Sequence, residues 1–155
     1  MKNEFNSLIE KAIQLELSLA ELYLQFHMLF PSDASFWWKL TIEEKNHAAL
    51  LKTLQEMNDS HVDMPVEFYP EGSEALDEST RRISKAIQDF KKNPDRKLAF
   101  RTAYDFENSA GEIHYDSFAK LASSSPLATI FKKLNGSDIN HAQRIMEYMN
   151  GLDMS

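Results

Sequence analysis

The sequence predicts an all-α fold: a four-helix bundle made of two helical hairpins joined by a long crossover, with one additional short helix. The chain of 155 residues contains only four Gly and five Pro, so it has few places to turn. Turn-forming residues gather in four places, and the segments between them keep a helical period over roughly 20 to 30 residues. Two of these segments also repeat the same residues in register, which indicates two related hairpins.

Five helices are expected, over residues 4–30, 34–58, 74–92, 94–122 and 126–150. Pro31 opens a short break, whereas 58–73 is a long connection with two prolines. We expect Ser73 to cap the third helix, and Asn93 to cap the fourth with Pro94 at its first position. The helix over about 74–92 has one narrow apolar stripe, which suits an accessory helix packed on an existing bundle.

The amino-acid composition excludes several classes of function. The length fits a single domain over 1–155, and 17 Lys and Arg against 24 Asp and Glu give a net charge of −7. A nucleic-acid-binding protein would normally carry the opposite charge. The absence of cysteine excludes disulfides, thiol catalysis, zinc–thiolate sites and iron–sulfur clusters, so any metal must be held by carboxylates and imidazoles.

The chain shows no targeting pattern. Its first residues have no apolar stretch behind a basic start, and no run of eighteen apolar residues occurs. We therefore expect a cytoplasmic protein without a membrane partner.

Two helices each carry an acid followed three residues later by a histidine: Glu44 with His47, and Asp138 with His141. Residues three apart share a helix face, so each pair can hold one ion. The apolar residues on the same faces are Trp37, Leu40, Ala48 and Leu51 around Glu44, and Phe131, Leu134, Ala142 and Ile145 around Asp138. Each pair is therefore expected to face the bundle core.

The other two long helices each offer one acid on an apolar face. Glu16 shares its face with Ile9, Ala12, Ala20 and Tyr23, and Glu107 shares its face with Phe100, Ala103, Ala110 and Phe118. Burying a carboxylate without a counter-charge costs several kcal/mol or forces its protonation. Two divalent cations would balance four buried carboxylates, which predicts a dinuclear metal site.

These residues resemble the ferritin-like di-iron superfamily, in particular the rubrerythrin-type and bacterioferritin-type proteins. That family has one Glu on each of the first and third bundle helices and Glu-x-x-His on the second and fourth. These motifs match, in order, Glu16 followed by Tyr23 and then the stretches 43–48, 107–119 and 138–142. The resemblance covers all four bundle helices.

The resemblance implies a ligand set and an activity. One metal would be held by Glu16, Glu44 and His47, and the other by Glu107, Asp138 and His141. Glu44 and Asp138 would bridge the two ions. It implies two iron ions, with manganese or a mixed pair as the alternative, and reduction of O2 or hydrogen peroxide.

Four departures from the family pattern stand out. Asp138 replaces the usual Glu and is one methylene shorter, which predicts a weaker second site or an altered metal spacing. Ala110 stands where rubrerythrin has an additional Glu, and Lys45 where bacterioferritin has its haem-binding Met. Without cysteine there is no rubredoxin domain, so an external electron donor protein is expected.

Three further residues lie near the predicted ligands. Tyr23 and Tyr115 are interpreted first as core rings, and His114 as a core histidine. The alternative is a hydrogen bond to a ligand carboxylate or, for His114, a role in proton transfer. Both interpretations stay open.

A homodimer is also expected. A stripe of leucines at seven-residue spacing runs along the first helix and consists of Leu8, Leu15, Leu22 and Leu29. Either the 74–92 helix or a second subunit would cover this stripe. Residues 36–38 carry more aromatic surface than one helix face can bury.

Three other functions compete with the redox enzyme. They are an iron-binding or ferroxidase protein for iron sequestration, a metal-binding bundle without redox turnover, and oxidation of an organic substrate. The 14 residues after His141 are too few for the last helices of a cage ferritin, which disfavours storage.

Overall fold

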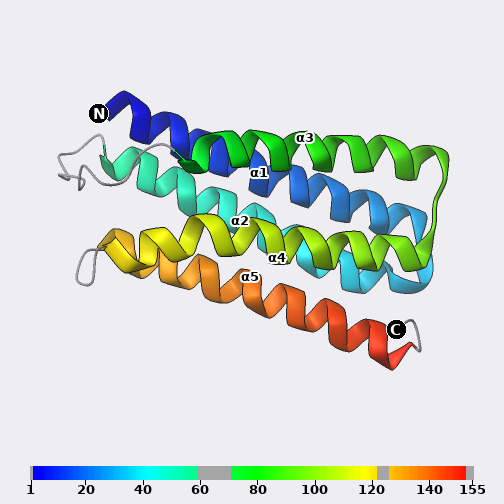
Figure 1. Cartoon of the computed structure of the whole chain (residues 1–155). Helices are drawn as coiled ribbons and strands as arrows, with labels where there is room; N and C mark the ends of the chain where they lie inside the picture. Colours follow the sequence, from blue (N-terminus) through cyan, green and yellow to red (C-terminus); the bar gives the residue numbers. More distant parts are fainter. Residues whose placement is uncertain (1, 59–70, 122–125, 153–155) are drawn as a thin grey trace. The chain divides into compact units, whose positions relative to one another are not determined.

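The computed structural model describes residues 2–58, 71–121 and 126–152, and over these ranges the chain is helical without any strand (Figure 1). Its elements are α1 (Lys2–Leu29), the short 3-10 helix η1 (Pro31–Asp33), α2 (Ala34–Asn58), α3 (Glu71–Lys92), α4 (Arg96–Leu121) and α5 (Pro126–Gly151). The all-α prediction with five α-helices is confirmed. No described helix combines the length and the hydropathy that a membrane-spanning segment needs.

The predicted helix ends agree closely with the structure, and α2 has the predicted bounds. The predicted cap of α4 is wrong by two residues. The backbone N–H of Asn93 donates to the Asp89 carbonyl at 2.9 Å, so Asn93 still closes the last turn of α3. Asp95 caps α4 instead, because its Oδ1 accepts the N–H of Leu98 at 2.9 Å.

The predicted cap of α3 is also wrong. Ser73 lies inside the helix, which already begins at Glu71. Its hydroxyl oxygen accepts a hydrogen bond from Lys11 Nζ at 2.6 Å and so joins α3 to α1. The serine therefore serves a contact between helices rather than the start of one.

The chain forms two compact units, Met1–Ile87 and Gln88–Ser155. In the first, α1 packs against α2, and in the second, α4 packs against α5 (Figure 1). Both predicted hairpins are thus present. Their assembly into one four-helix bundle, and the single domain over 1–155, stay predictions.

The α1–α2 hairpin has an aromatic core near its turn. Trp37 is fully buried, stacks on Tyr23 with ring centroids 5.7 Å apart, and meets Phe26 edge-on at 4.9 Å. The predicted core faces of both helices are confirmed as buried: Ile9, Ala12, Ala20, Tyr23, Trp37, Leu40, Ala48 and Leu51. This packing fixes the level at which residues of α1 face residues of α2.

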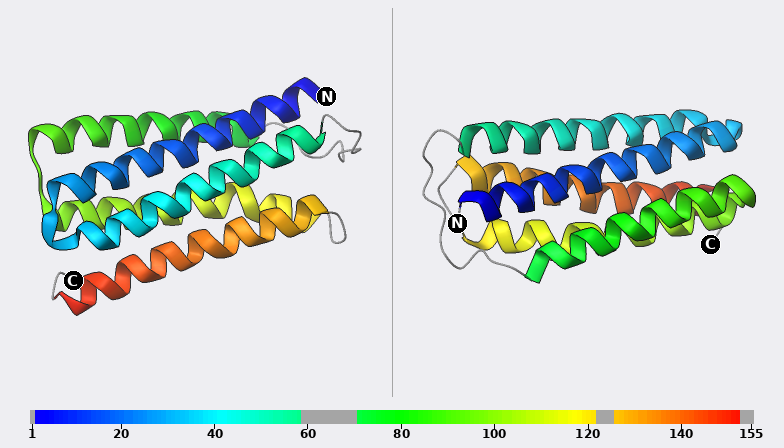
Figure 2. Two further views of the ribbon diagram at one scale, coloured as in Figure 1. Left: turned by 180° about the vertical axis from the view of Figure 1, so that it is seen from behind. Right: turned by 90° about the horizontal axis from the view of Figure 1, so that it is seen from above.

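Within the first unit, α3 lies alongside α1 (Figure 2). Lys11 Nζ also donates to Asp77 Oδ2 at 2.6 Å, and Gln25 Nε2 donates to the Ile87 carbonyl at 3.2 Å. Leu15 and Leu22, at the centre of the predicted leucine stripe, are buried. The centre of that stripe therefore needs no second subunit to cover it.

The α4–α5 hairpin also buries its predicted face where the structure describes it. Phe100, Ala103, Leu134, Ala142 and Ile145 are buried. Phe100 of α4 stacks on Tyr148 of α5, with ring centroids 5.4 Å apart. The side chains of Ala110, Phe118 and Phe131 lie outside the described residues.

Candidate metal centre

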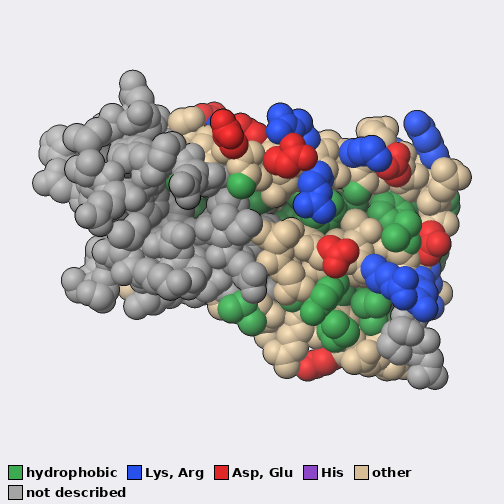
Figure 3. Space-filling view, viewed as in Figure 1, with side chains coloured by type: hydrophobic (Ala, Val, Ile, Leu, Met, Phe, Trp, Pro, Cys, Tyr) green, Lys and Arg blue, Asp and Glu red, His purple; other side chains and the backbone are tan. Residues whose placement is uncertain are grey.

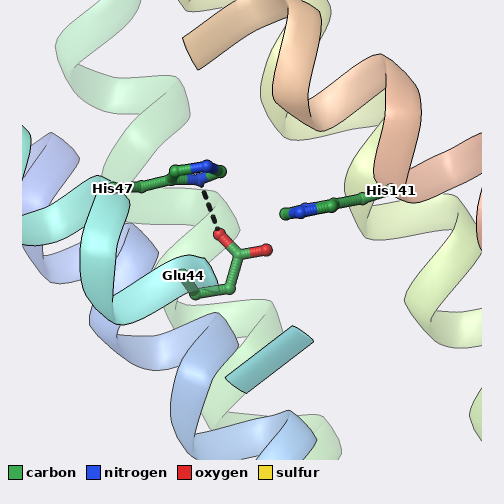
Figure 4. Close-up of side chains that lie close together, drawn as sticks. All are labelled: Glu44, His47 and His141. Atoms are coloured by element: carbon green, nitrogen blue, oxygen red, sulfur yellow. Dashed lines mark hydrogen bonds and ion pairs between the residues drawn. The ribbon is translucent and has the colours of Figure 1, made fainter. Parts of the chain in front are cut away.

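Glu44 and His47 form a buried pair on α2. They are one helical turn apart, and His47 Nδ1 lies 3.1 Å from Glu44 Oε2 in a hydrogen bond (Figure 4). Glu44 is 0 % exposed and His47 8 %. The predicted Glu-x-x-His pair therefore points inward, and its imidazole nitrogen and carboxylate oxygen face each other.

Glu16 on α1 adds a third ligand-type side chain to this pair. Its Oε2 lies 3.4 Å from His47 Nδ1, and the residue is buried. The stacking of Tyr23 on Trp37 explains the register, because Tyr23 follows Glu16 by seven residues and Trp37 precedes Glu44 by seven. Two helical turns along each antiparallel helix bring both acids to the same level.

The two acids hold a proton on His47. Burial by itself lowers the pKa of this imidazole, but the hydrogen bonds to Glu16 and Glu44 and their negative charges raise it to about 10. In the metal-free protein the imidazole is therefore positively charged at neutral pH. Its single charge balances only one of the two carboxylates that it faces.

The α4–α5 hairpin repeats this relationship. Glu107 on α4 and His141 on α5 are both buried, and His141 Nδ1 lies 3.6 Å from Glu107 Oε2. The side chain of Asp138, the predicted third member, lies outside the described residues. In both hairpins, the acid of the first helix faces Nδ1 of the histidine on the second.

On α2, Glu44 offers a carboxylate oxygen and His47 an imidazole nitrogen with which each could bind a metal ion (Figure 4). On α5, His141 offers an imidazole nitrogen of the same kind. Carboxylate and imidazole donors suit several divalent metal ions, iron and manganese among them. The identity of the ion stays a prediction.

Of the three residues predicted to lie near the ligands, the structure describes the side chain of Tyr23 but not those of His114 and Tyr115. Tyr23 is buried and packs against the rings of Phe26 and Trp37, as expected for a core residue. The side chains of His114 and Tyr115 lie outside the described residues, although both belong to α4. Their alternatives stay open.

Comparison with known proteins adds no relative to this picture. No protein-family model, curated protein or solved structure matches the chain. The resemblance to ferritin-like proteins therefore rests on this chain's own residues and spacing.

Proposed function

We propose that this chain is a ferritin-like, rubrerythrin-type di-iron protein that reduces O2 or hydrogen peroxide. The carrying observation is that each hairpin buries a histidine whose Nδ1 faces a buried carboxylate of the neighbouring helix, at 3.4 Å for His47 and Glu16 and 3.6 Å for His141 and Glu107. In this proposal both hairpins close into one four-helix bundle around a common dinuclear centre.

The buried charge supports the presence of metal. Glu16, Glu44 and Glu107 are each at most 3 % exposed, and Asp138 is expected to be a fourth acid at the centre. Buried carboxylates need a counter-charge nearby. The proton on His47 meets part of that need, and two divalent ions would meet all of it.

In the proposal, Glu16, Glu44 and His47 hold one ion, and Glu107, Asp138 and His141 hold the other. When bound by these residues, two reduced iron ions would supply the two electrons that, with two protons, convert hydrogen peroxide into two water molecules. In the proposal, an external electron donor protein returns these two electrons to the iron pair.

The chain itself supplies orientation and a dry environment. Packing around Trp37, Leu40 and Ala48 holds the Glu44 face of α2 in place and excludes water from it. On binding an ion through Nδ1, His47 would release the proton that this nitrogen carries. The positive charge of the ion would then balance the carboxylates of Glu16 and Glu44 in place of that proton.

Anaerobic loading with Fe(II) tests the proposal. We expect two ions per chain and a new near-UV absorption after hydrogen peroxide or O2 is added. Glu44→Ala and His47→Ala should each lose bound iron, whereas Glu56→Ala, which removes an exposed acid of the same helix, should not. Clearly fewer than two ions in the wild type, or unchanged iron content in both site variants, contradicts the proposal.

The competing functions give different results in the same experiments. A bundle without redox turnover would bind metal and show no absorption change with either oxidant. A storage protein would assemble into a cage, whereas we propose a homodimer, because Met28 (65 % exposed) and Trp38 (45 % exposed) are large apolar side chains on the surface of the first unit. Size-exclusion chromatography separates a dimer from a 24-subunit cage.

A further inference from the structure

The basic residues of this acidic chain are concentrated in one stretch. Eight of its 17 Lys and Arg lie between residues 81 and 101, together with only two acids, Asp89 and Asp95. The remaining residues comprise nine basic and 22 acidic ones, a net charge of −13. Figure 3 shows Lys and Arg side chains over the end of α3 and the start of α4.

Five of these residues flank the connection between the two helices, and we call them the basic patch: Lys91, Lys92, Arg96, Lys97 and Arg101. All are exposed except Arg96, which is half-buried. The connection has only three residues, which span at most about 11 Å, so the two helix ends stay close. Lys97 and Arg101 lie one turn apart on α4 and share a face.

Two residues of the basic patch, Arg96 and Lys97, have the unfavourable charge for the start of a helix. The N-terminus of a helix carries a partial positive charge, and acids in the first turn normally stabilise it. The first turn of α4 has no acid and instead begins with Arg96 and Lys97. The Asp95 cap offsets part of this unfavourable charge, and the exposed Lys97 remains accessible at the surface.

An apolar side chain lies within the basic patch. Leu98 is 51 % exposed, directly follows Lys97, and lies one turn before Arg101. Its backbone N–H is bound by Asp95 Oδ1, which fixes its position in the first turn. An apolar residue surrounded by charges is the usual anatomy of a protein–protein interface, with an apolar centre and a charged rim.

We propose that the basic patch and Leu98 form a docking surface for a protein that presents acidic residues around an apolar spot. The residues outside the patch carry a net charge of −12, which disfavours an extended anionic partner such as a nucleic acid or an anionic bilayer. A small protein can engage the patch alone. This surface does not depend on the metal centre, although an external electron donor would be one such partner for the proposed reaction.

A charge-reversal experiment tests the docking surface, with a fluorescently labelled acidic flavodoxin as the probe. The patch variant is K92E/K97E/R101E. The control variant, K39E/K52E/K133E, changes the net charge equally at exposed positions elsewhere. We expect the patch variant to weaken binding at least about tenfold and the control less than about threefold, with binding that falls as salt rises.

Leu98→Ser provides a second test, which does not depend on whether the patch variant folds. We expect about threefold weaker binding with an unchanged salt dependence, since the charges remain. Equal effects of the two charge-reversal variants, no binding by the wild type, or no effect of Leu98→Ser would overturn the proposal. So would tighter binding to a single-stranded RNA or to phosphatidylserine vesicles than to flavodoxin.

Discussion

Nδ1 of His47 on α2 lies 3.4 Å from Oε2 of Glu16 on α1, although the two residues are 31 positions apart in the chain. The same nitrogen also bonds Glu44, so one imidazole joins two buried carboxylates from neighbouring helices. A proton therefore occupies the place at which a metal ion would balance these charges.

Metal binding should strengthen as pH rises. The pKa of His47 is about 10 in the metal-free protein, so at pH 6 to 8 the ion must displace the proton on Nδ1. For one proton released, the apparent affinity should rise about tenfold per pH unit. Mn(II) titrations followed by electron paramagnetic resonance measure this change, and calorimetry in two buffers of different ionisation enthalpy counts the protons. An affinity that does not change with pH would contradict this role of His47.

The metal-free protein should instead lose stability as pH rises. The folded pKa of His47, about 10, lies above its ordinary value of 6.5, so its contribution is complete below pH 6.5 and is lost as pH rises through 10. Urea unfolding in the presence of EDTA at pH 7 and pH 10 gives the change in unfolding free energy. His47→Gln should show a clearly smaller change, since it removes the titrating group. An equal change in both proteins would mean that other groups cause the loss.

Trp37 and Trp38 should differ sharply in their contribution to stability. Trp37 is fully buried among aromatic rings, so Trp37→Ala should cost about 3–5 kcal/mol. Trp38 is 45 % exposed, and Trp38→Ala should cost less than about 1 kcal/mol. Urea unfolding followed by far-UV circular dichroism compares them without relying on tryptophan fluorescence. Similar costs for the two variants would show that the aromatic core is not packed as described.

The start of α4 should depend on Asp95 and not on Asn93. Asp95→Ala removes the acceptor for the Leu98 N–H and should cost about 1 kcal/mol of unfolding free energy. Asn93→Ala leaves that bond intact and should change stability by less than about 0.5 kcal/mol. The unfolding free energies of both variants, measured together, decide the matter. The reverse order would restore Asn93 as the cap.

The periodicity of the sequence was sufficient to predict the helices and their inward faces. A helix repeats every 3.6 residues, so the apolar residues around Glu44 and Glu16 already define which side is buried. The structure confirms burial for both acids and for Glu107. Asp138 lies outside the described side chains, so its predicted role is still open.

Local periodicity and turn chemistry are enough to predict the all-helical class, the two hairpins and the buried acids. The Asp95 cap of α4, the hydrogen bond from Lys11 to Ser73 and the approach of His47 to Glu16 become visible only in the folded protein. Two of these contacts join residues that are distant in the chain. The third is made by one of several residues that could each have capped the helix. All three depend on how helices pack and where each turn closes, which no spacing along a single helix contains.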